Sequence, residues 1–522
     1  MDSVSWKWED DELSEYLEDI EDQFDALVEN GDEDARTDAR EQFEDGADGI
    51  LKMLLIAFCP RLRDVKFITQ EHREQSTLGW LKRLVQGSVL YGSHWPPGIS
   101  NIRDIAVGVE SDTWMSKEQP SDRDPGNKSM QTFSTLLRLP RIHSIYYNDL
   151  RREGLYDRTD YESPTLMPPR SSTVKHIFLD DCSETPKYFS TALSQAPLAL
   201  ETFTLRAGDC DDGMDRANVL VAELCFGQAS SLHTLMFYGP YEYHQINGYG
   251  CAAYSSSELE DAQNLKTVAM DVSDLKWGFF CQMVRNTNHG YDKLAHEEQR
   301  RGFVKWFCES AFPSTIERLV LWGKPWRRFR GLYKANKEPF LIWLEDALVA
   351  AIESRRWRDV IDVDTDGGRL DANHEVYYPK LKAVYLEDIE GRKGSDGDPD
   401  DPRTDALLFQ KLIQVGKKAG IDIHTLTNRT PAQHTHDFPT APDKYDLRSG
   451  PWWECRSEID DWVFDVYKGR RVPPGCGKCG KCKGCLKEYR RGLWMALDGE
   501  TGTMRRSKRL QTCVKQEVQR YQ

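Results

Sequence analysis

Four cysteines near the C-terminal end have the residue type and spacing that most directly indicate chemistry. Cys476, Cys479, Cys482 and Cys485 follow one another at every third position in PPGCGKCGKCKGCLKEY. Thiolates with two residues between them can both reach one metal ion, and the glycines between them permit the tight turns that this requires. The spacing predicts a metal site, with zinc preferred over an iron–sulfur cluster. Because ligands packed this closely strain a tetrahedral shell, a flexible tail with free thiols is the alternative.

The surroundings of these cysteines are strongly basic, whereas the N-terminal end is strongly acidic. Residues 468–522 contain 15 Lys and Arg against 4 Asp and Glu, a net charge of +11, and residues 1–50 contain 3 against 20, a net charge of −17. A basic tail of this kind suits nuclear import, nucleic-acid contact or pairing with the acidic end. Since few aromatic residues interleave with its lysines and arginines, we expect import or pairing, and nucleic acid is not the expected partner.

A second group that could bind a ligand lies in the middle of the chain. The segment GKPWRRFRGLY places Trp326, Arg327, Arg328 and Arg330 together in one expected loop. Guanidinium groups beside aromatic rings suit the recognition of carboxylates or phosphates, such as those of a phosphorylated peptide. These residues are therefore candidates for partner binding, and an ordinary exposed loop is the alternative.

Common catalytic motifs are missing from the sequence. It contains no Gly-x-Ser-x-Gly, no glycine-rich phosphate loop ending in Lys-Ser or Lys-Thr, and no His-Glu-x-x-His. Each of these motifs positions a nucleophile, a phosphate or a metal ion. We therefore expect a protein that binds other molecules rather than an enzyme.

The elements that must position these residues are indicated by one recurring pattern, apolar-x-x-apolar-x-apolar. In an extended strand, its second and third apolar positions point to the same face, and the residue between them points to the other. The pattern occurs nine times: Leu62, Val65, Phe67; Ile102, Ile105, Val107; Ile142, Ile145, Tyr147; Val174, Ile177, Leu179; Leu200, Phe203, Leu205; Leu232, Leu235, Phe237; Leu265, Val268, Met270; Ile316, Leu319, Leu321; and Leu381, Val384, Leu386. Each occurrence predicts a short strand, and a last strand is expected near Ile421 and Ile423.

Stretches with helical periodicity separate most of these strands. They are Ile50 to Phe58, Leu78 to Val89, Phe133 to Leu139, Tyr188 to Leu193, Val219 to Leu224, Phe303 to Phe307, Phe340 to Ile352 and Leu407 to Val415. One strand and one helix cannot bury their apolar faces alone, so successive units must stack strand beside strand and helix beside helix. The sequence therefore predicts an α/β solenoid with a curved parallel sheet, outer helices and flexible termini.

Three segments carry a resemblance to a known family. LLIAFCPRLRDVKF (54–67), LLRLPRIHSIYY (136–147) and VKHIFLDDC (174–182) resemble the divergent leucine-rich-repeat regions of fungal F-box-type proteins. The resemblance covers about residues 48–427 and implies an irregular leucine-rich-repeat solenoid that presents a substrate-binding surface. Such proteins often recruit targets to a Skp-cullin ubiquitin ligase. The sequence departs from that family in one place, since no F-box pattern, Leu-Pro followed by spaced Leu and Ile, precedes the first repeat.

The residues between the second and third apolar positions are expected to line the concave face of the sheet. They are Lys66, Ala106, Tyr146, Phe178, Thr204, Met236, Ala269, Val320 and Tyr385. Tyr146, Phe178, Met236 and Tyr385, with the neighbouring Tyr238 and Trp322, form an apolar group of the kind that marks contact surfaces when exposed. We expect a protein partner to bind there, unless inserted loops cover this face.

These observations divide the chain into four parts. We expect an acidic N-terminal segment with an amphipathic helix (1–47), the solenoid (48–427), a linker (428–467) and a basic cysteine-containing tail (468–522). Neither a signal peptide nor a membrane-spanning segment is evident, so a cytoplasmic or nuclear protein that does not bind membranes is expected. The expected function is a non-catalytic interaction scaffold, including the substrate-recognition subunit of a ligase. The alternative is a metal-binding or nucleic-acid-associated regulator that acts through the tail.

Overall fold

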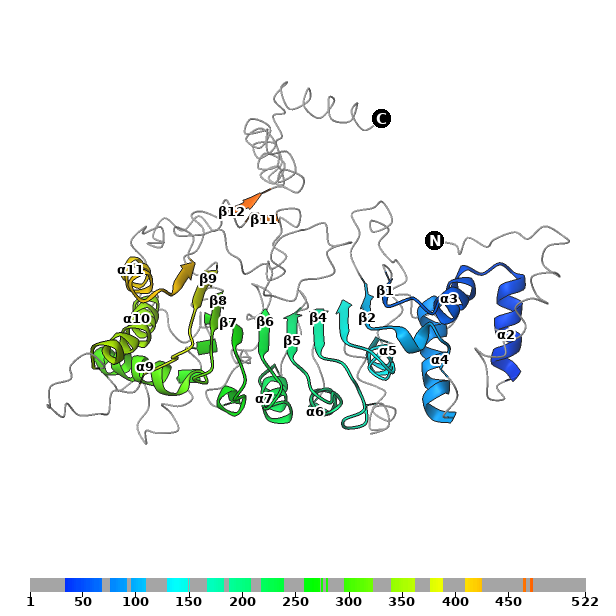
Figure 1. Cartoon of the computed structure of the whole chain (residues 1–522), viewed down its shortest axis with the longest axis horizontal. Coiled ribbons are helices and arrows are strands. Elements are labelled where there is room, and N and C mark those ends of the chain that lie inside the picture. The colour runs from blue at the N-terminus through cyan, green and yellow to red at the C-terminus, as the bar shows by residue number, and fades with distance from the viewer. Residues whose placement is uncertain are drawn as a thin grey trace, which may run out of the picture.

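The structure of the chain is a computed structural model. It describes residues 33–67, 76–91, 95–108, 129–148, 150, 167–182, 187–207, 217–238, 258–272, 274–275, 278–279, 295–322, 339–361, 376–387, 409–424, 463–465 and 470–472. A single ten-stranded sheet dominates these residues, and its strands lie side by side in chain order from β1 to β10 (Figure 1). Every neighbouring pair in this sheet is parallel. The molecule is therefore an α/β protein with the repetitive, solenoid-like arrangement that the spacing predicts.

Each recurring pattern in the sequence forms one strand of this sheet. The strands are β1 (Asp64–Phe67), β2 (Asp104–Val107), β3 (Ser144–Asn148), β4 (His176–Cys182), β5 (Thr202–Ala207), β6 (Thr234–Tyr238), β7 (Thr267–Asp271), β8 (Arg318–Trp322), β9 (Ala383–Glu387) and β10 (Asp422–His424). The nine predicted strands and the expected last strand are thus confirmed. Strand order follows chain order because each unit can bury its apolar residues only against its neighbours.

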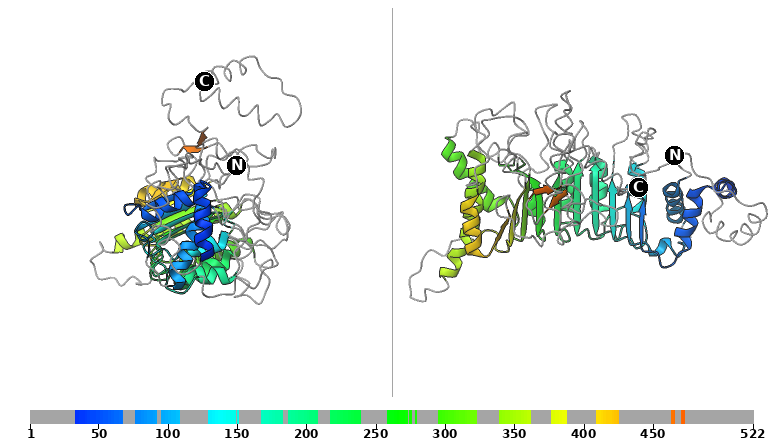
Figure 2. Two further views of the ribbon diagram at one scale, coloured as in Figure 1. Left: turned by 90° about the vertical axis from the view of Figure 1, so that its right-hand side faces the viewer. Right: turned by 90° about the horizontal axis from the view of Figure 1, so that it is seen from above.

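The helices accompany the strands along the array (Figures 1 and 2). They are α2 (Glu33–Glu44), α3 (Asp48–Phe58), α4 (Thr77–Tyr91), α5 (Ser129–Leu136), α6 (Lys187–Gln195), α7 (Ala217–Gly227), α9 (His296–Ser310), α10 (Pro339–Ile361) and α11 (Gln410–Ala419), with the short 3-10 helices η1 (Ile99–Asn101) and η3 (Glu258–Asp261). Helix α2 lies at the end near β1, and α10 and α11 lie at the other end. Each of the eight predicted helical stretches overlaps a helix, although α5 ends at Leu136 rather than at Leu139, and residues 407 and 408 of the last stretch lie outside the described residues. Neighbouring helices contact one another: α6 packs against α7, and α10 packs against both α9 and α11.

The second apolar positions of the patterns form one continuous row on the helix side of the sheet. In register order the row is Val65, Ile105, Ile145, Ile177, Phe203, Leu235, Val268, Leu319, Val384 and Ile423. All of these residues are buried in one hydrophobic core. Burying one such side chain stabilises the fold by roughly 1.5–3 kcal/mol, and a slip of one residue would turn a whole strand to the wrong face. The apolar spacing therefore fixes the register.

One helix was not expected from the sequence. In α2, Ala39 and Phe43 are buried in the same core as the rest of the array. The helix is also held by polar contacts, because the indole nitrogen of Trp80 in α4 donates to Gln42 at 2.8 Å. The segment assigned to the acidic N-terminal part thus contains a helix that packs with the array. The amphipathic helix expected at residues 9–28 lies outside the described residues.

Two further strands lie beyond the array in the sequence. β11 (Val463–Asp465) and β12 (Arg470–Val472) pair in an antiparallel manner. They fall at the junction between the predicted linker and the predicted basic tail. Among the helices that the structure describes, none is long and apolar enough to cross a membrane.

Candidate functional site

The residues predicted to line the concave face do share one row of the sheet, which we call the central row. Tyr146 lies opposite Phe178, and Met236 lies two strands further on. The complete row is Lys66, Ala106, Tyr146, Phe178, Thr204, Met236, Ala269, Val320, Tyr385 and His424. Because successive side chains of a strand point to opposite faces, this row lies on the face that the core does not use.

The prediction that the aromatic and methionine side chains of the central row are exposed is wrong. The exposed fraction is 8% for Tyr146, 4% for Phe178, 0% for Met236 and 5% for Tyr385. Part of this burial comes from contacts within the face itself. The ring of Tyr146 meets that of Phe178 edge to face at 5.0 Å, and its hydroxyl donates to the buried Asp180 at 2.7 Å. A partner therefore does not find these side chains on an open surface.

The last two residues of the central row, at the C-terminal end of the array, form another pair of rings in contact. Tyr385 stacks flat on His424, with ring centroids 4.3 Å apart and planes inclined by 6°. The two residues lie directly opposite each other in β9 and β10. Stacking of adjacent rings reduces the accessible surface of both, so the row is packed along the sheet at this end as well.

The remaining predicted site residues are less completely placed. Tyr238 and Trp322 occupy the last positions of β6 and β8, but their side chains lie outside the described residues. Two further groups of predicted site residues lie entirely outside the described residues. They are the loop residues Trp326, Arg327, Arg328 and Arg330 and the metal candidates Cys476, Cys479, Cys482 and Cys485. Within the part of the chain that the structure describes, no group of three or more His, Cys, Asp or Glu side chains could hold a metal ion.

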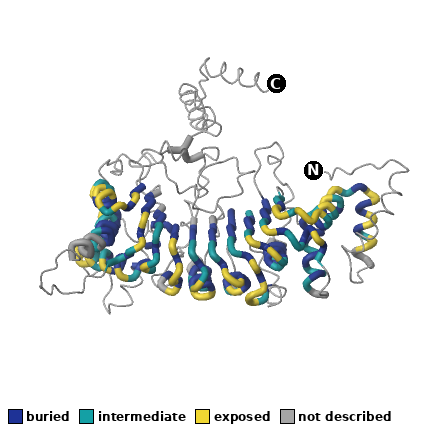
Figure 3. The backbone as a smooth tube through the Cα atoms, viewed as in Figure 1, coloured by how far each residue is buried: buried dark blue, intermediate teal, exposed yellow. Residues whose placement is uncertain are grey.

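A different row is accessible, and it consists of the residues that immediately precede the strands. We call it the strand-start row: Arg63, Arg103, His143, Lys175, Glu201, His233, Lys266, Glu317 and Lys382. Every member has an ionisable side chain, and each is exposed or half-buried. Figure 3 shows exposed residues at the turns that lead into the strands. This edge of the sheet is thus a charged surface that runs along the array.

A repeated backbone arrangement aligns the strand-start row. The carbonyl oxygen of Arg63 accepts the N–H groups of Arg103, at 2.8 Å, and of Asp104, at 3.1 Å. The same double acceptance recurs at each following member up to Glu317. Because neighbouring strands are about 4.8 Å apart, the side chains of the row are held at that spacing along the edge.

From Lys175 onward, two pairs of oppositely charged members of the row neutralise each other. The ammonium group of Lys175 lies 2.5 Å from the carboxylate of Glu201, and Lys382 makes the equivalent ion pair with Glu317. The hydrogen bond from Lys175 lowers the pKa of Glu201, and that from Lys382 lowers the pKa of Glu317. Both carboxylates are therefore charged at neutral pH.

The first part of the row is different, because it carries an excess of positive charge. Arg63 and Arg103 are exposed neighbours, and Arg61, Arg141 and His143 are exposed beside them. We call these five residues the basic cluster. Among the described residues, none of its four arginines makes an ion pair with a carboxylate.

The surroundings of the basic cluster are polar and contain two carboxylates. Arg141 donates to the side-chain oxygen of Asn101 at 2.9 Å, a neutral partner that leaves its charge uncompensated. Asp104 accepts from the hydroxyl of Ser144 at 2.5 Å and lies 3.9 Å from His143. With Asp64 and Asp104 counted against the four arginines, the local net charge is 4 − 2 = +2, in a chain whose total is −16.

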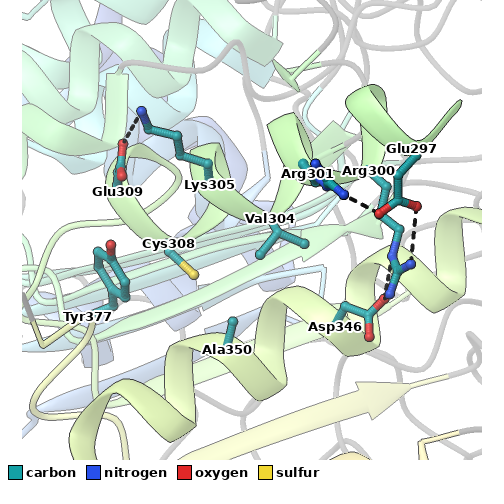
Figure 4. A pocket seen from close by; sticks show the side chains of 10 residues that line it. All are labelled: Glu297, Arg300, Arg301, Val304, Lys305, Cys308, Glu309, Asp346, Ala350 and Tyr377. Carbon is teal, nitrogen blue, oxygen red and sulfur yellow. Dashed lines mark hydrogen bonds and ion pairs between the residues drawn. The ribbon is translucent and has the colours of Figure 1, made fainter. Parts of the chain in front are cut away.

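A groove of about 400 Å³ between α9 and α10 is the other candidate for a site (Figure 4). Its rim charges are paired with each other: Arg300 lies 2.7 Å from Asp346 and 3.3 Å from Glu297. Burial raises the pKa of the Cys308 thiol to about 12, so this thiol is protonated at neutral pH. The groove thus offers neither an activated nucleophile nor uncompensated charge to a ligand.

The strand-start row was missed in the sequence although its signal is present there. In all nine patterns, the residue directly after the first apolar position is Arg, His, Lys or Glu. Comparisons with known protein families, with curated proteins and with solved structures find no match to this chain. The candidate site is therefore argued from the geometry of this molecule.

Proposed function

We propose that this chain is a non-catalytic protein-interaction scaffold of the leucine-rich-repeat type, which binds a protein partner along its strand-start row. The observation that carries the proposal is the alignment of nine ionisable side chains along one accessible edge. Electrostatic complementarity over an extended edge gives a partner its orientation and its specificity. A rigid array supplies that edge without any need for catalytic groups.

Photo-crosslinking at defined positions tests this proposal. A photoreactive amino acid is placed singly at three exposed row positions, Arg103, Lys266 and Lys382, in the full chain. The matched controls are three exposed helix positions: Lys52, Arg301 and Lys417. After irradiation in native extract, we expect the same partner protein to be crosslinked from the row and not from the helices. Equal or stronger adducts from the helix positions would contradict the proposal.

The ligase role is a more specific form of the same proposal. It is supported by the resemblance of the repeat segments to fungal F-box-type proteins. Recovery of a Skp or cullin subunit with the intact chain would support it, and partners without any such subunit would oppose it. Substitutions in the central row cannot serve as binding-deficient variants in this experiment. Replacing Tyr146, Phe178 or Tyr385 by Asp would bury a carboxylate and destabilise the fold.

The alternative function, a regulator acting through the basic tail, depends on the cysteine spacing alone. If Cys476, Cys479, Cys482 and Cys485 bind zinc, the purified chain should contain about one equivalent of metal. The double variant Cys476→Ser, Cys479→Ser should then contain none. A metal content near zero in both proteins would oppose this alternative.

A further inference from the structure

We propose that the basic cluster at the start of the array binds an acidic segment of a protein partner, one rich in carboxylates or phosphorylated side chains. This inference rests on the proposed scaffold function and adds to it the chemistry of the partner and the place where it binds. The cluster lies at the starts of β1, β2 and β3, on the first three units of the sheet.

The first argument is the departure of this region from the charge pattern of the rest of the row. Like charges directly opposite each other on neighbouring strands are destabilising, whereas opposite charges stabilise. The later units follow this rule through the pairs Lys175 with Glu201 and Glu317 with Lys382. Arg63 and Arg103 violate it, since they are adjacent in the ladder and have the same charge. Local rules are broken most often at functional sites, and here a bound anion would remove the repulsion.

The second argument is the chemistry of the side chains. Arginine presents a planar fork of N–H groups that matches a carboxylate or a phosphate with two parallel hydrogen bonds. Arg61, Arg63, Arg103 and Arg141 are all exposed, so their guanidinium groups can reach a ligand without opening the fold. The spacing of about 4.8 Å between strands places successive arginines within reach of successive acidic side chains of one peptide.

A peptide fits this cluster better than a nucleic acid does. Tight nucleic-acid binding requires many phosphate contacts, and single strands also require aromatic rings on which bases stack. The carboxylates of Asp64 and Asp104 lie beside the cluster, and the four arginines together with these two carboxylates have a net charge of only +2. A peptide can place its acidic side chains selectively at the arginines and neutral ones beside the two aspartates.

Fluorescence anisotropy with the full chain tests the inference. The probes are a short labelled peptide of alternating glutamate and serine, its phosphoserine form, an uncharged glutamine form and an oligonucleotide of similar charge. We expect the two acidic peptides to bind and the glutamine peptide not to bind. The triple variant Arg63→Glu, Arg103→Glu, Arg141→Glu should weaken binding about 30-fold or more, because it replaces three guanidinium groups that can pair with acidic side chains by carboxylates that repel them.

A matched control separates a local site from general attraction. The variant Lys380→Glu, Arg301→Glu, Lys417→Glu has the same change in net charge at exposed positions elsewhere. It should bind the acidic peptides as the wild type does. Both variants keep residues 468–522, so the basic tail contributes equally to each measurement. Unchanged thermal unfolding of the variants shows that they are folded.

Three outcomes would overturn the inference. They are the absence of binding to either acidic peptide, an equal loss of binding in both triple variants, and stronger binding of the oligonucleotide than of the peptides. None of these decides the scaffold function, which the crosslinking experiment tests separately. If crosslinks form along Lys266 and Lys382 but the acidic peptides do not bind, the scaffold proposal stands and the acidic partner is rejected.

Discussion

Gln228 shows how much of this array depends on single buried polar side chains. It lies directly after α7 and is 5% exposed. Its amide nitrogen donates to the carbonyl oxygens of Ser194, at 2.7 Å, and Pro197, at 3.2 Å. Its amide oxygen accepts the N–H of Leu200 at 2.9 Å and the hydroxyl of Ser231 at 2.9 Å. One side chain thus joins the turn of one unit to the turn of the next.

Replacing this residue should therefore destabilise the fold. The substitution Gln228→Leu leaves the Leu200 N–H and the Ser194 carbonyl buried without these partners, and each unsatisfied group costs roughly 1–3 kcal/mol. We expect a loss of about 3 kcal/mol in the free energy of unfolding, measured by denaturant titration. Gln195→Leu is the control, because Gln195 is exposed at the end of α6 and the change should cost less than about 0.5 kcal/mol. Equal effects of the two substitutions would show that the four hydrogen bonds contribute little.

His176 makes stability depend on pH. Burial is the largest cause that lowers its pKa below the ordinary 6.5, and the nearby His143 and Lys175 lower it further, against the carboxylates of Glu201 and Asp104. As pH falls below 6.5, the unfolded chain therefore binds a proton at this position before the folded chain does, and the folded state loses stability.

The variant His176→Gln should lack this part of the pH dependence. Between neutral pH and about pH 5, its unfolding midpoint should fall less than that of the wild type. Both proteins should lose stability further below pH 4.5, where Glu201 and Glu317 begin to be protonated in the unfolded chain only. Parallel curves for the two proteins above pH 5 would contradict the assignment to His176.

Among the packing contacts between elements, the junction between α3 and the second unit is a close backbone approach. The N–H of Gly98 donates to the carbonyl oxygen of Ala57 at 2.7 Å, close to the end of α3. A Cβ atom at position 98 would overlap the carbonyl oxygen of Ile56 and would lie 2.8 Å from that of Ala57. Only glycine allows the backbone of η1 to approach the helix end this closely.

Alanine at this position should move η1 away from α3. Overpacking of this kind costs typically about 1–3 kcal/mol, and we expect Gly98→Ala to lower the free energy of unfolding by that amount. Gly87→Ala is the matched control, since Gly87 lies within α4 and a Cβ atom there meets nothing within 4 Å. That substitution should raise stability by about 0.5–1 kcal/mol. A similar sign for both changes would refute the steric argument.

The helices and strands were predictable because each strand repeats the same apolar spacing and each helix follows its own period. The helix α2 was not predictable, because most of its twelve residues are charged and Ala39 and Phe43 are its only buried apolar residues among those whose burial the structure describes. Its position is decided by contacts with distant residues, such as Asp38 with Arg83 at 2.8 Å, which no local pattern reveals. A polar helix that packs on an apolar array gives a weak signal in the sequence alone.

At the scale of the whole molecule, the face of each residue was predictable but its exposure was not. The strand period places Tyr146 and Phe178 on the face opposite the core, and the register confirms this. Whether such residues are open to a partner depends on everything that packs over that face, which spacing does not contain. The accessible charges of Arg63 and Arg103 lie instead at the edge, where a residue escapes the two-sided burial of the sheet. A site on such an array is therefore better sought at its turns than at the centres of its strands.

The linear order of the units also predicts how the molecule comes apart. In a stacked array each unit contacts only its neighbours, so a local defect should spread outward from its position. Phe203 in β5 is fully buried, and its ring lies 5.9 Å from that of Phe237 in the next strand. Phe203→Ala should cost about 3–5 kcal/mol and accelerate hydrogen exchange first in β4, β5 and β6. Exchange in β1 and β10 should change little.

Ile423→Ala in the last strand provides the comparison at the end of the array. Ile423 is 4% exposed and has a neighbour in the sheet on one side only, Val384 in β9. Its loss should accelerate exchange in β10 and α11 while leaving β4 to β6 protected, as measured by mass spectrometry of peptic fragments. A uniform acceleration over all ten strands in both variants would mean that the sheet unfolds as one cooperative unit. In that case the strands that carry the basic cluster could not unfold or fold independently of the distant units. A partner bound there would then stabilise the whole array rather than its first three units.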